Sequence, residues 1–267
     1  MNNNVDANQM DKSRIGAAFD KAADHYDDIA LFQHQVCNRL FSFLQERLPP
    51  TRQPDMIFDG GCGTGYGSEL LHRHWPESSV FGCDLSLEML RHSRERNAEG
   101  VCGDLESLPF SENSFNVAWS SLALQWCLPN QAFAELCRVL APGGMLVFST
   151  LVAGTLHEID FAFSGIDAYR RVLPFATEDD IGSALGKAGL TDIRLQTEEW
   201  VTWHTDIKSL LATIRGIGAN QVGGERRKAL MGKSAWKTAQ ARYESLRGKN
   251  GMLPVTYRLV FGSASKR

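Results

Sequence analysis

The sequence predicts an α/β fold with a doubly wound, mostly parallel sheet. Strand-like apolar runs alternate with helical patterns between residues 55 and 150, which is typical of a parallel sheet covered on both faces. A glycine-rich turn, "DGGCGTGYG", follows the first of these runs at residues 59–67, where α/β folds bind nucleotide-like ligands. Acidic residues follow three successive runs, so we expect them to meet at one edge of the sheet.

The spacing of apolar residues and the positions of glycine and proline predict each helix and strand. Residues 14–47 have helical spacing of apolar residues, and "PPTRQP" at 49–54 ends that region. This gives an N-terminal helical cap at 1–54 and a second domain at 55–267. The predicted strands are 55–61, 78–86, a short one within 98–110, 115–127, 145–150, 191–202 and 254–265. The predicted helices are 65–75, 86–97, 130–144 and 177–189, with helical lid insertions at about 153–176 and 205–247.

Composition narrows the class of protein. The net charge of -3 and the hydrophobic fraction of 43% over 267 residues are ordinary for a soluble protein, and they give no sign of nucleic acid or membrane. No apolar run is long enough to cross a bilayer, and residues 1–14 lack the apolar core of a signal peptide. None of the six cysteines forms a CxxC pair, so we expect buried reduced thiols, no metal site and a cytoplasmic location.

The acids around the glycine turn indicate the ligand. Asp59 precedes Gly61, Gly63 and Gly65, and a carboxylate there repels a pyrophosphate but attracts a cationic amine. A ligand with an amino group beside a nucleoside fits, and S-adenosylmethionine is such a ligand. The alternative for Asp59 alone is a turn residue that accepts local amide hydrogen bonds.

Two further acids strengthen this interpretation. Asp84 ends the second strand and is placed to accept hydrogen bonds from ribose hydroxyls. Asp104 follows the third strand and is placed to accept from an adenine amino group. Leu85 and Leu105 would pack on the adenine faces. The predicted cofactor-binding set also includes Ser120, in the fourth strand.

The segments "FDGGCGTG", "GCDLS", "GDLESLPF", "FNVAWSSLALQW" and "RVLAPGGMLVFST" resemble the class I S-adenosylmethionine-dependent methyltransferases over residues 55–150. This resemblance implies a Rossmann-like seven-stranded sheet of order 3-2-1-4-5-7-6. Its last strand is antiparallel, and residues 254–265 would supply it.

The flanking segments suggest what accepts the methyl group. Tyr26 is an aromatic residue with a polar tip beside two aspartates, suited to closing over a ligand, and Gln33 would reach the same mouth. For the apolar residues of this helix, simple packing is the alternative. The insertion at 153–176 carries His157 and the pair Arg170–Arg171. An arginine in a lid can hold a carboxylate by a planar bidentate contact, although an isolated arginine is more often a surface residue.

Charge is concentrated in one segment. Residues 201–250 hold ten Lys or Arg against three acids, a net +7, so the remainder carries -10. Such an excess suits an acidic macromolecular partner, and a solvated helical face is the alternative. Aromatic residues are too sparse there to favour nucleic acid.

The flanks "FDKAADHYDDIALFQ", "STLVAGTLHEI", "IRGIGAN" and "YRLVFG" resemble the malonyl-[acyl-carrier-protein] O-methyltransferase family of biotin synthesis. The resemblance implies that the acceptor is the free carboxylate of a malonyl thioester, on an acidic acyl carrier protein or on coenzyme A. Arg171 would hold this carboxylate, since "RVLP" keeps the better register, with Arg170 as the alternate. Tyr26 and His157 would shape the pocket.

Three other functions stay open at this point. The first is an enzyme that acts on a quinone precursor or another small acid, for which His157 would matter as a base. The second is a domain that binds S-adenosylmethionine without transferring a methyl group. A dinucleotide-dependent reductase is disfavoured because the acid comes before the glycines.

Overall fold

The computed structural model describes residues 11–48, 52–96, 98–167, 169–216 and 232–267. They form a seven-stranded sheet in the order β3-β2-β1-β4-β5-β7-β6, which confirms the predicted order. Strands β1 to β5 run parallel, and β7 is antiparallel to both β5 and β6. The strands are β1 Met56–Gly60, β2 Ser79–Asp84, β3 Glu99–Cys102, β4 Phe115–Ser121, β5 Leu140–Leu151, β6 Leu190–His204 and β7 Leu253–Lys266.

Helices cover both faces of the sheet because side chains alternate along each strand. Ile57 of β1 packs with α3 (Leu31–Arg47) and α4 (Tyr66–His74). Its neighbour Phe58 packs with α6 (Pro129–Val139) and α8 (Glu178–Lys187) on the other face. Helix α5 (Leu87–Glu95) lies beside β2 and β3. The carboxyl ends of β1 to β4 therefore open at one edge.

The N-terminal helical pattern is divided into several pieces. Helix α1 (Lys12–Ala22) leads through a 3-10 turn, η1 (Ala23–His25), into the short α2 (Tyr26–Ile29) and then α3. Aspartates at the junctions favour turns and caps over helix interiors. Helix α3 shares an apolar cluster with the sheet. The division into a cap and a second domain at residue 54 stays a prediction.

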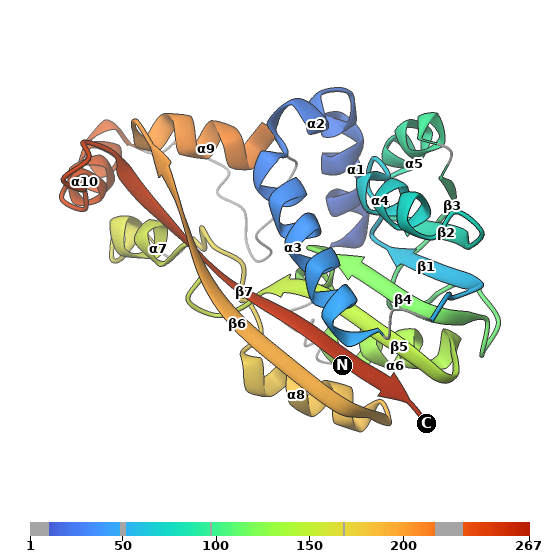
Figure 1. Ribbon diagram of the computed structural model, residues 1–267. Coiled ribbons are helices and arrows are strands. Elements are labelled where there is room, and N and C mark those ends of the chain that lie inside the picture. The colour runs from blue at the N-terminus through green and yellow to red at the C-terminus, as the bar shows by residue number, and fades with distance from the viewer. Residues whose placement is uncertain (1–10, 49–51, 97, 168, 217–231) are drawn as a thin grey trace, which may run out of the picture.

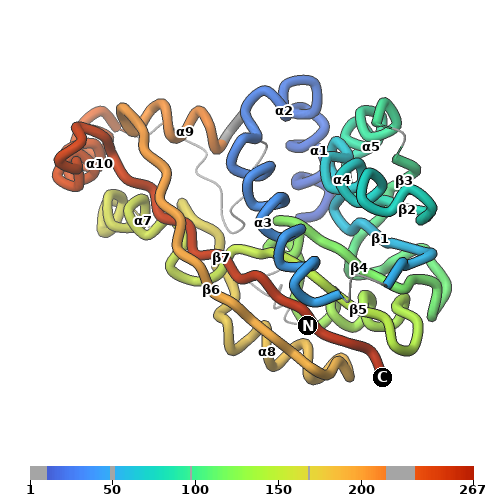
Figure 2. The backbone as a smooth tube through the Cα atoms, viewed as in Figure 1, coloured from blue at the N-terminus to red at the C-terminus, as the bar shows by residue number. Residues whose placement is uncertain are grey.

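The long β6–β7 pair extends past the rest of the sheet and carries the lid (Figures 1 and 2). Helices α7 (His157–Phe163), α9 (Ile207–Gly216) and α10 (Lys233–Glu244) gather at its far end and share one apolar cluster. Among the described residues of the insertion at 153–176, only those of α7 are in an α-helix. Gly154 and Gly165, with φ of 94° and 69°, break the helical pattern on either side of α7.

The structure differs from the sequence-based expectation at the start of β5 and at one cysteine. Strand β5 begins at Leu140, although the pattern predicted helix as far as residue 144, because Leu140 pairs with Phe115 across a bulge. All six cysteines are free thiols as expected, but Cys102 is exposed.

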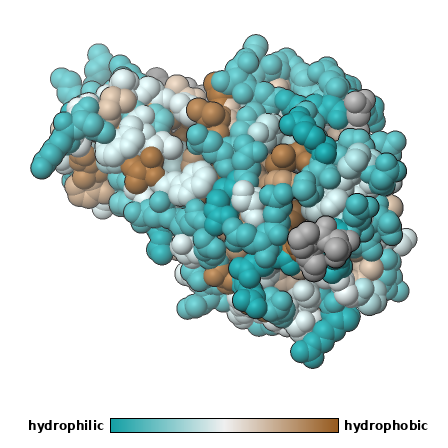
Figure 3. All heavy atoms as spheres, viewed as in Figure 1, coloured by the Kyte–Doolittle hydropathy of each residue, from teal (hydrophilic) through white to brown (hydrophobic). Residues whose placement is uncertain are grey.

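No helix in the described ranges is long and apolar enough to span a bilayer. The face seen in Figure 3 is mostly hydrophilic, with separate small apolar patches.

Candidate active site

A cavity of about 640 Å³ opens at the carboxyl ends of the parallel strands. One end is bounded by the loops after β1, β2 and β3. The other end is bounded by the lid, and its wall is largely apolar. Of the predicted site residues, those on this wall are Tyr26, Gly61, Gly63, Asp84, Leu85, Asp104, Leu105, Arg170 and Arg171.

The glycine loop brings backbone close to the cavity. A Cβ on Gly61 would lie 2.2 Å from the Cβ of Ala123, so only glycine fits against that loop. Gly63 has a φ of 54°, and the space beyond it is open for 4 Å. Gly61 is therefore required by the close approach of Ala123, and Gly63 leaves the backbone open toward the cavity. Gly65, also with positive φ, ends the loop but lies off the cavity wall.

Backbone donors hold Asp84. The N–H of Gly63 donates to its Oδ2 and the N–H of Ser86 to its Oδ1, each at 2.9 Å. Burial raises the pKa of Asp84, and these hydrogen bonds oppose the increase. The backbone N–H of Leu85 also favours the ionised form of Asp84. Because a carboxylate offers about four acceptor positions, Asp84 keeps capacity for a further donor, such as a ribose hydroxyl.

Asp59 lies beneath the glycine loop rather than on the cavity wall. Its side chain is 2% exposed, and its Oδ2 accepts from Ser68 Oγ at 2.6 Å. Burial, with the nearby charge of Asp84, raises the pKa of Asp59 to about 7. A cationic ligand above the loop would favour its ionised form.

Asp104 contacts a lysine that the sequence did not single out. Lys12 of α1 places its Nζ 3.1 Å from Asp104 Oδ1, 2.7 Å from Glu106 Oε1 and 3.7 Å from Cys127 Sγ. The ligand atoms of Asp104, Glu106 and Cys127 lie close enough together to hold a metal ion, and these residues form the one such group found in the described chain. The Lys12 ammonium already lies among them. Asp104 Oδ2 has no hydrogen-bond partner in the described ranges.

Ser120 and its neighbour face opposite ways. Ser120 is fully buried, and its Oγ donates to the Gly60 carbonyl at 2.8 Å, so it fixes β4 against β1. Ser121, next along the strand, lines the cavity. The side-chain alternation of a strand accounts for this one-residue difference.

Two polar side chains of the cap reach the cavity with unsatisfied groups. The Tyr26 hydroxyl has no hydrogen-bond partner among the described residues, and burial followed by the charges of Asp84 and Asp27 raises its pKa. Gln33 also lines the cavity, and its buried Oε1 has no partner in the described structure. Buried polar atoms without partners are rare in proteins, so Gln33 Oε1 fits a role toward a bound ligand. Tyr26 is half-buried, and its hydroxyl is available to a ligand in the cavity.

The two lid arginines differ in how they are held. Arg171 donates to Asp167 Oδ2 at 2.8 Å and to the Tyr169 carbonyl at 2.7 Å. Its guanidinium also lies over the Phe163 ring, 5.0 Å from the centroid. Both arginines line the main cavity and an adjoining outer pocket of about 400 Å³, but Arg170 is exposed whereas Arg171 is half-buried. Arg171 is thus the oriented member of the pair.

His157 does not lie on the cavity wall. It begins α7, its side chain is 60% exposed, and its Nδ1 contacts the Gly154 carbonyl at 3.2 Å. No histidine occurs among the described residues of the wall. Its neighbour Glu158 is buried and accepts from the backbone N–H and the hydroxyl of Thr256, which fixes α7 on β7.

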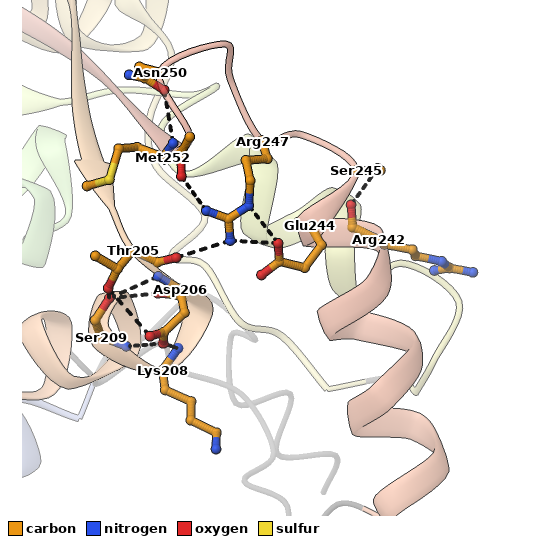
Figure 4. A network of polar contacts seen from close by, with 11 residues as sticks. Thr205, Asp206, Lys208, Ser209, Arg242, Glu244, Ser245, Arg247, Asn250 and Met252 are labelled. Carbon is orange, nitrogen blue, oxygen red and sulfur yellow. Dashed lines mark hydrogen bonds and ion pairs between the residues drawn. The ribbon is translucent and has the colours of Figure 1, made fainter.

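Part of the predicted basic segment stabilises the lid itself (Figure 4). Arg247 donates to Glu244 Oε2 at 2.6 Å and to the Thr205 carbonyl at 3.1 Å, so the start of α9 is tied to the end of α10. The side chains of four lysines are exposed and have no ion pair among the described residues: Lys208, Lys233, Lys237 and Lys249. Residues 217–231, with most of "RGIGAN" and Arg226, Arg227 and Lys228, lie outside the described ranges.

The sheet order and the acid-bearing loops define a class I methyltransferase, and the model of a methyltransferase domain matches residues 58–148. Solved structures share the fold at low identity. The YcgJ protein of Bacillus subtilis superposes with a TM-score of 0.58 at 16% identity over 86% of this chain and 99% of that one. Phosphoethanolamine N-methyltransferase 2 of Haemonchus contortus, solved with S-adenosylhomocysteine, gives 0.56 at 20% identity over 93% and 60%.

Sequence relatives narrow the family. A malonyl-[acyl-carrier protein] O-methyltransferase of Herminiimonas arsenicoxydans is 52% identical over 96% of this chain and 97% of its own length. One from Laribacter hongkongensis is 39% identical over 97% and 91%. The chain belongs to this family of S-adenosylmethionine-dependent methyltransferases.

Proposed function

We propose that this enzyme methylates the free carboxylate of a malonyl thioester carried by an acyl carrier protein, as an early step of biotin (pimeloyl) synthesis. The observation that carries the proposal is the arginine pair, Arg170 and Arg171, on a largely apolar wall continuous with the cofactor end. The names of the relatives support the same acceptor. Malonyl-coenzyme A is the alternative carrier of the same chemical group.

Bound S-adenosylmethionine supplies an electrophilic methyl group. Three features of the cavity fit this cofactor: the open space at Gly63, the oriented Asp84 and the unpaired Gln33 Oε1. Asp84 would hold the ribose and Asp104 the adenine amino group, with Leu85 and Leu105 on the adenine faces. Asp59 would favour the amino group from below the loop.

The acceptor needs no general base. A carboxylate has a reference pKa of about 4, so it is ionised at neutral pH. Catalysis is then orientation and exclusion of water. Arg171 holds the acceptor carboxylate in a fixed direction, and Tyr26 covers the site. His157, the residue considered as a base for other acceptors, lies off the described wall and contributes to the outer shape of the lid.

The exposed lysines of the lid would dock the carrier protein. Lys233 and Lys237 lie on α10, Lys208 on α9 and Lys249 after α10. Acyl carrier proteins are acidic, so opposite charges would steer the thioester toward the cavity. The free cysteines suit the reducing cytoplasm, where we place the reaction.

The test is methyl transfer from labelled S-adenosylmethionine to malonyl-carrier protein, with malonyl-coenzyme A and acetyl-carrier protein alongside. The proposal requires label on the malonyl substrates, more rapidly on the carrier protein, and none on the acetyl substrate. Equal labelling of the acetyl form would remove the carboxylate as acceptor. No labelling of any of the three, with cofactor binding intact, would direct the search to quinone precursors or other small acids.

A further inference from the structure

The N-terminal cap is attached to all three loops that surround the cofactor end. Lys12 and Asp20 of α1 and Asp27 of α2 each contact a different loop, after β3, β2 and β1 respectively. Lys12 Nζ donates to Asp104 Oδ1 at 3.1 Å. The Ser86 hydroxyl donates to Asp20 at 2.6 Å, and the Thr64 hydroxyl donates to Asp27 at 2.8 Å. The cap therefore crosses the edge of the sheet as a fixed wall of the cofactor site.

Asp27 has the most extensive of these contacts. Its Oδ1 accepts from Thr64 Oγ1, and its Oδ2 accepts from Arg96 Nη2 at 2.9 Å. Arg96 Nη1 in turn donates to the Thr64 carbonyl at 2.7 Å. Thr64 is 2% exposed and stands between Gly63 and Gly65. The side chain and the carbonyl of this one loop residue are thus both held by the Asp27–Arg96 pair.

A histidine completes the arrangement around Asp27. His34 of α3 places its Nε2 3.2 Å from Asp27 Oδ1, and its ring stacks on Tyr66 with centroids 4.0 Å apart. Burial disfavours the ionised form of Asp27, but hydrogen bonds from His34 and Thr64 and the charge of Arg96 lower its pKa to about 2. Asp27 is therefore a charged, fully engaged group at neutral pH.

Tyr26 immediately precedes Asp27 and depends on it for its position. The Tyr26 side chain lines the cavity, and its hydroxyl has no partner in the described chain. Since no bond of its own orients the ring, its orientation follows from the backbone of α2. That backbone is fixed to the glycine loop through Asp27.

We propose that Asp27 is a positioning residue for the cofactor, which sets the glycine loop through Thr64 and carries Tyr26 to the cavity. The inference concerns the S-adenosylmethionine site alone and stands apart from the identity of the acceptor. A side chain that only stabilised the fold would change the melting temperature without changing ligand affinity selectively.

The test is calorimetric titration of the full chain with S-adenosylhomocysteine, which requires no acceptor. The variants are Asp27→Ala, Thr64→Val and their combination. Asp24→Ala is the matched control, because Asp24 is another aspartate of the cap that pairs with His92 of α5 at 3.1 Å and contacts no cofactor loop. Melting temperatures of all variants accompany the titrations.

Asp27→Ala should raise the dissociation constant about tenfold and Thr64→Val about fivefold, as for loss of hydrogen bonds to a charged group. The combination should be no more than about twofold weaker than Asp27→Ala alone, because both changes break one contact. Asp24→Ala should stay within about twofold of the parent. Equal effects at positions 24 and 27, or fully additive effects at 27 and 64, would overturn the proposal. A parent protein that fails to bind would instead overturn the cofactor site itself.

Discussion

The two ends of the cavity are held by different kinds of contact. At the cofactor end, backbone N–H groups fix the key carboxylate, with Gly63 and Ser86 both 2.9 Å from Asp84. At the lid end, which we propose binds the acceptor, Arg171 is held by the side chain of Asp167, the ring of Phe163 and the Tyr169 carbonyl. Backbone donors belong to the fold and survive most substitutions. Side-chain contacts change with single residues, so we expect acceptor specificity to be adjusted at the lid end.

The largest effect should follow from removing the backbone-held carboxylate. Asp84→Ala should weaken S-adenosylhomocysteine binding by about 100-fold or more, since two hydrogen bonds to a charged group are worth about 1.5–3 kcal/mol each. Asp104→Ala, which removes one predicted contact, should weaken it about tenfold. Calorimetric titration measures both. Equal losses for the two variants would contradict the ribose assignment of Asp84.

At the acceptor end, Arg171→Ala should reduce kcat/KM for the malonyl substrate by about 100-fold while cofactor affinity stays unchanged. Arg170→Ala is the comparison, with an expected loss of about tenfold or less, because Arg170 lies at the exposed side of the wall. Steady-state kinetics with labelled cofactor measures both. A larger loss for Arg170→Ala would exchange the roles of the two arginines, and unchanged turnover in both would remove the carboxylate contact.

The same difference explains what the sequence could predict. The strand order was expected from the family resemblance. The strand–helix alternation, the glycine-rich turn after the first strand and the placement of Asp84 and Asp104 follow from local patterns at strand ends. These features depend on backbone geometry that a short segment already encodes.

The side-chain contacts between distant segments could not be read in this way. Lys12 meets Asp104 across 92 positions, and Asp27 meets Arg96 across 69. Nothing in either local pattern indicates such a partner. Likewise His157 occurs in the expected insertion, but the direction of its side chain depends on how Glu158 fixes α7 to β7.

A smaller effect should come from the lysines outside the cavity. The charge reversals Lys233→Glu and Lys237→Glu together should raise KM for malonyl-carrier protein about tenfold, and added salt should reduce the difference. The matched control is Lys187→Glu on α8, an exposed lysine just before Leu190, which pairs with Lys266 at the end of the β6–β7 pair opposite the lid. Helix α8 lies apart from α9 and α10 in Figure 1. A malonyl-pantetheine substrate, which lacks the protein, should not distinguish the variants. An equal increase for Lys187→Glu would exclude local docking on α10.

The smallest effect should be a pH dependence that arises at the buried acid below the loop. Because the pKa of Asp59 is about 7 in the folded protein, Asp59 gains a proton below neutrality. A cationic amino group binds best above the ionised form. The affinity for S-adenosylhomocysteine should therefore fall about fourfold from about pH 8 to about pH 6.5, as titration of one such group requires.

Asp59→Asn provides the control, since this variant should bind S-adenosylhomocysteine more weakly at about pH 8 and lose the dependence of affinity on pH.

The stability of the unliganded protein tests the same group independently. The folded-state pKa of Asp59 lies above its ordinary value of 3.8, so the folded chain binds more protons than the unfolded chain between about pH 4 and 7. Asp59 therefore lowers stability progressively as pH rises through that window. Asp59→Asn should raise the melting temperature at about pH 8 more than at about pH 5, and an equal change at both would show that Asp59 of the free protein is already ionised at about pH 5.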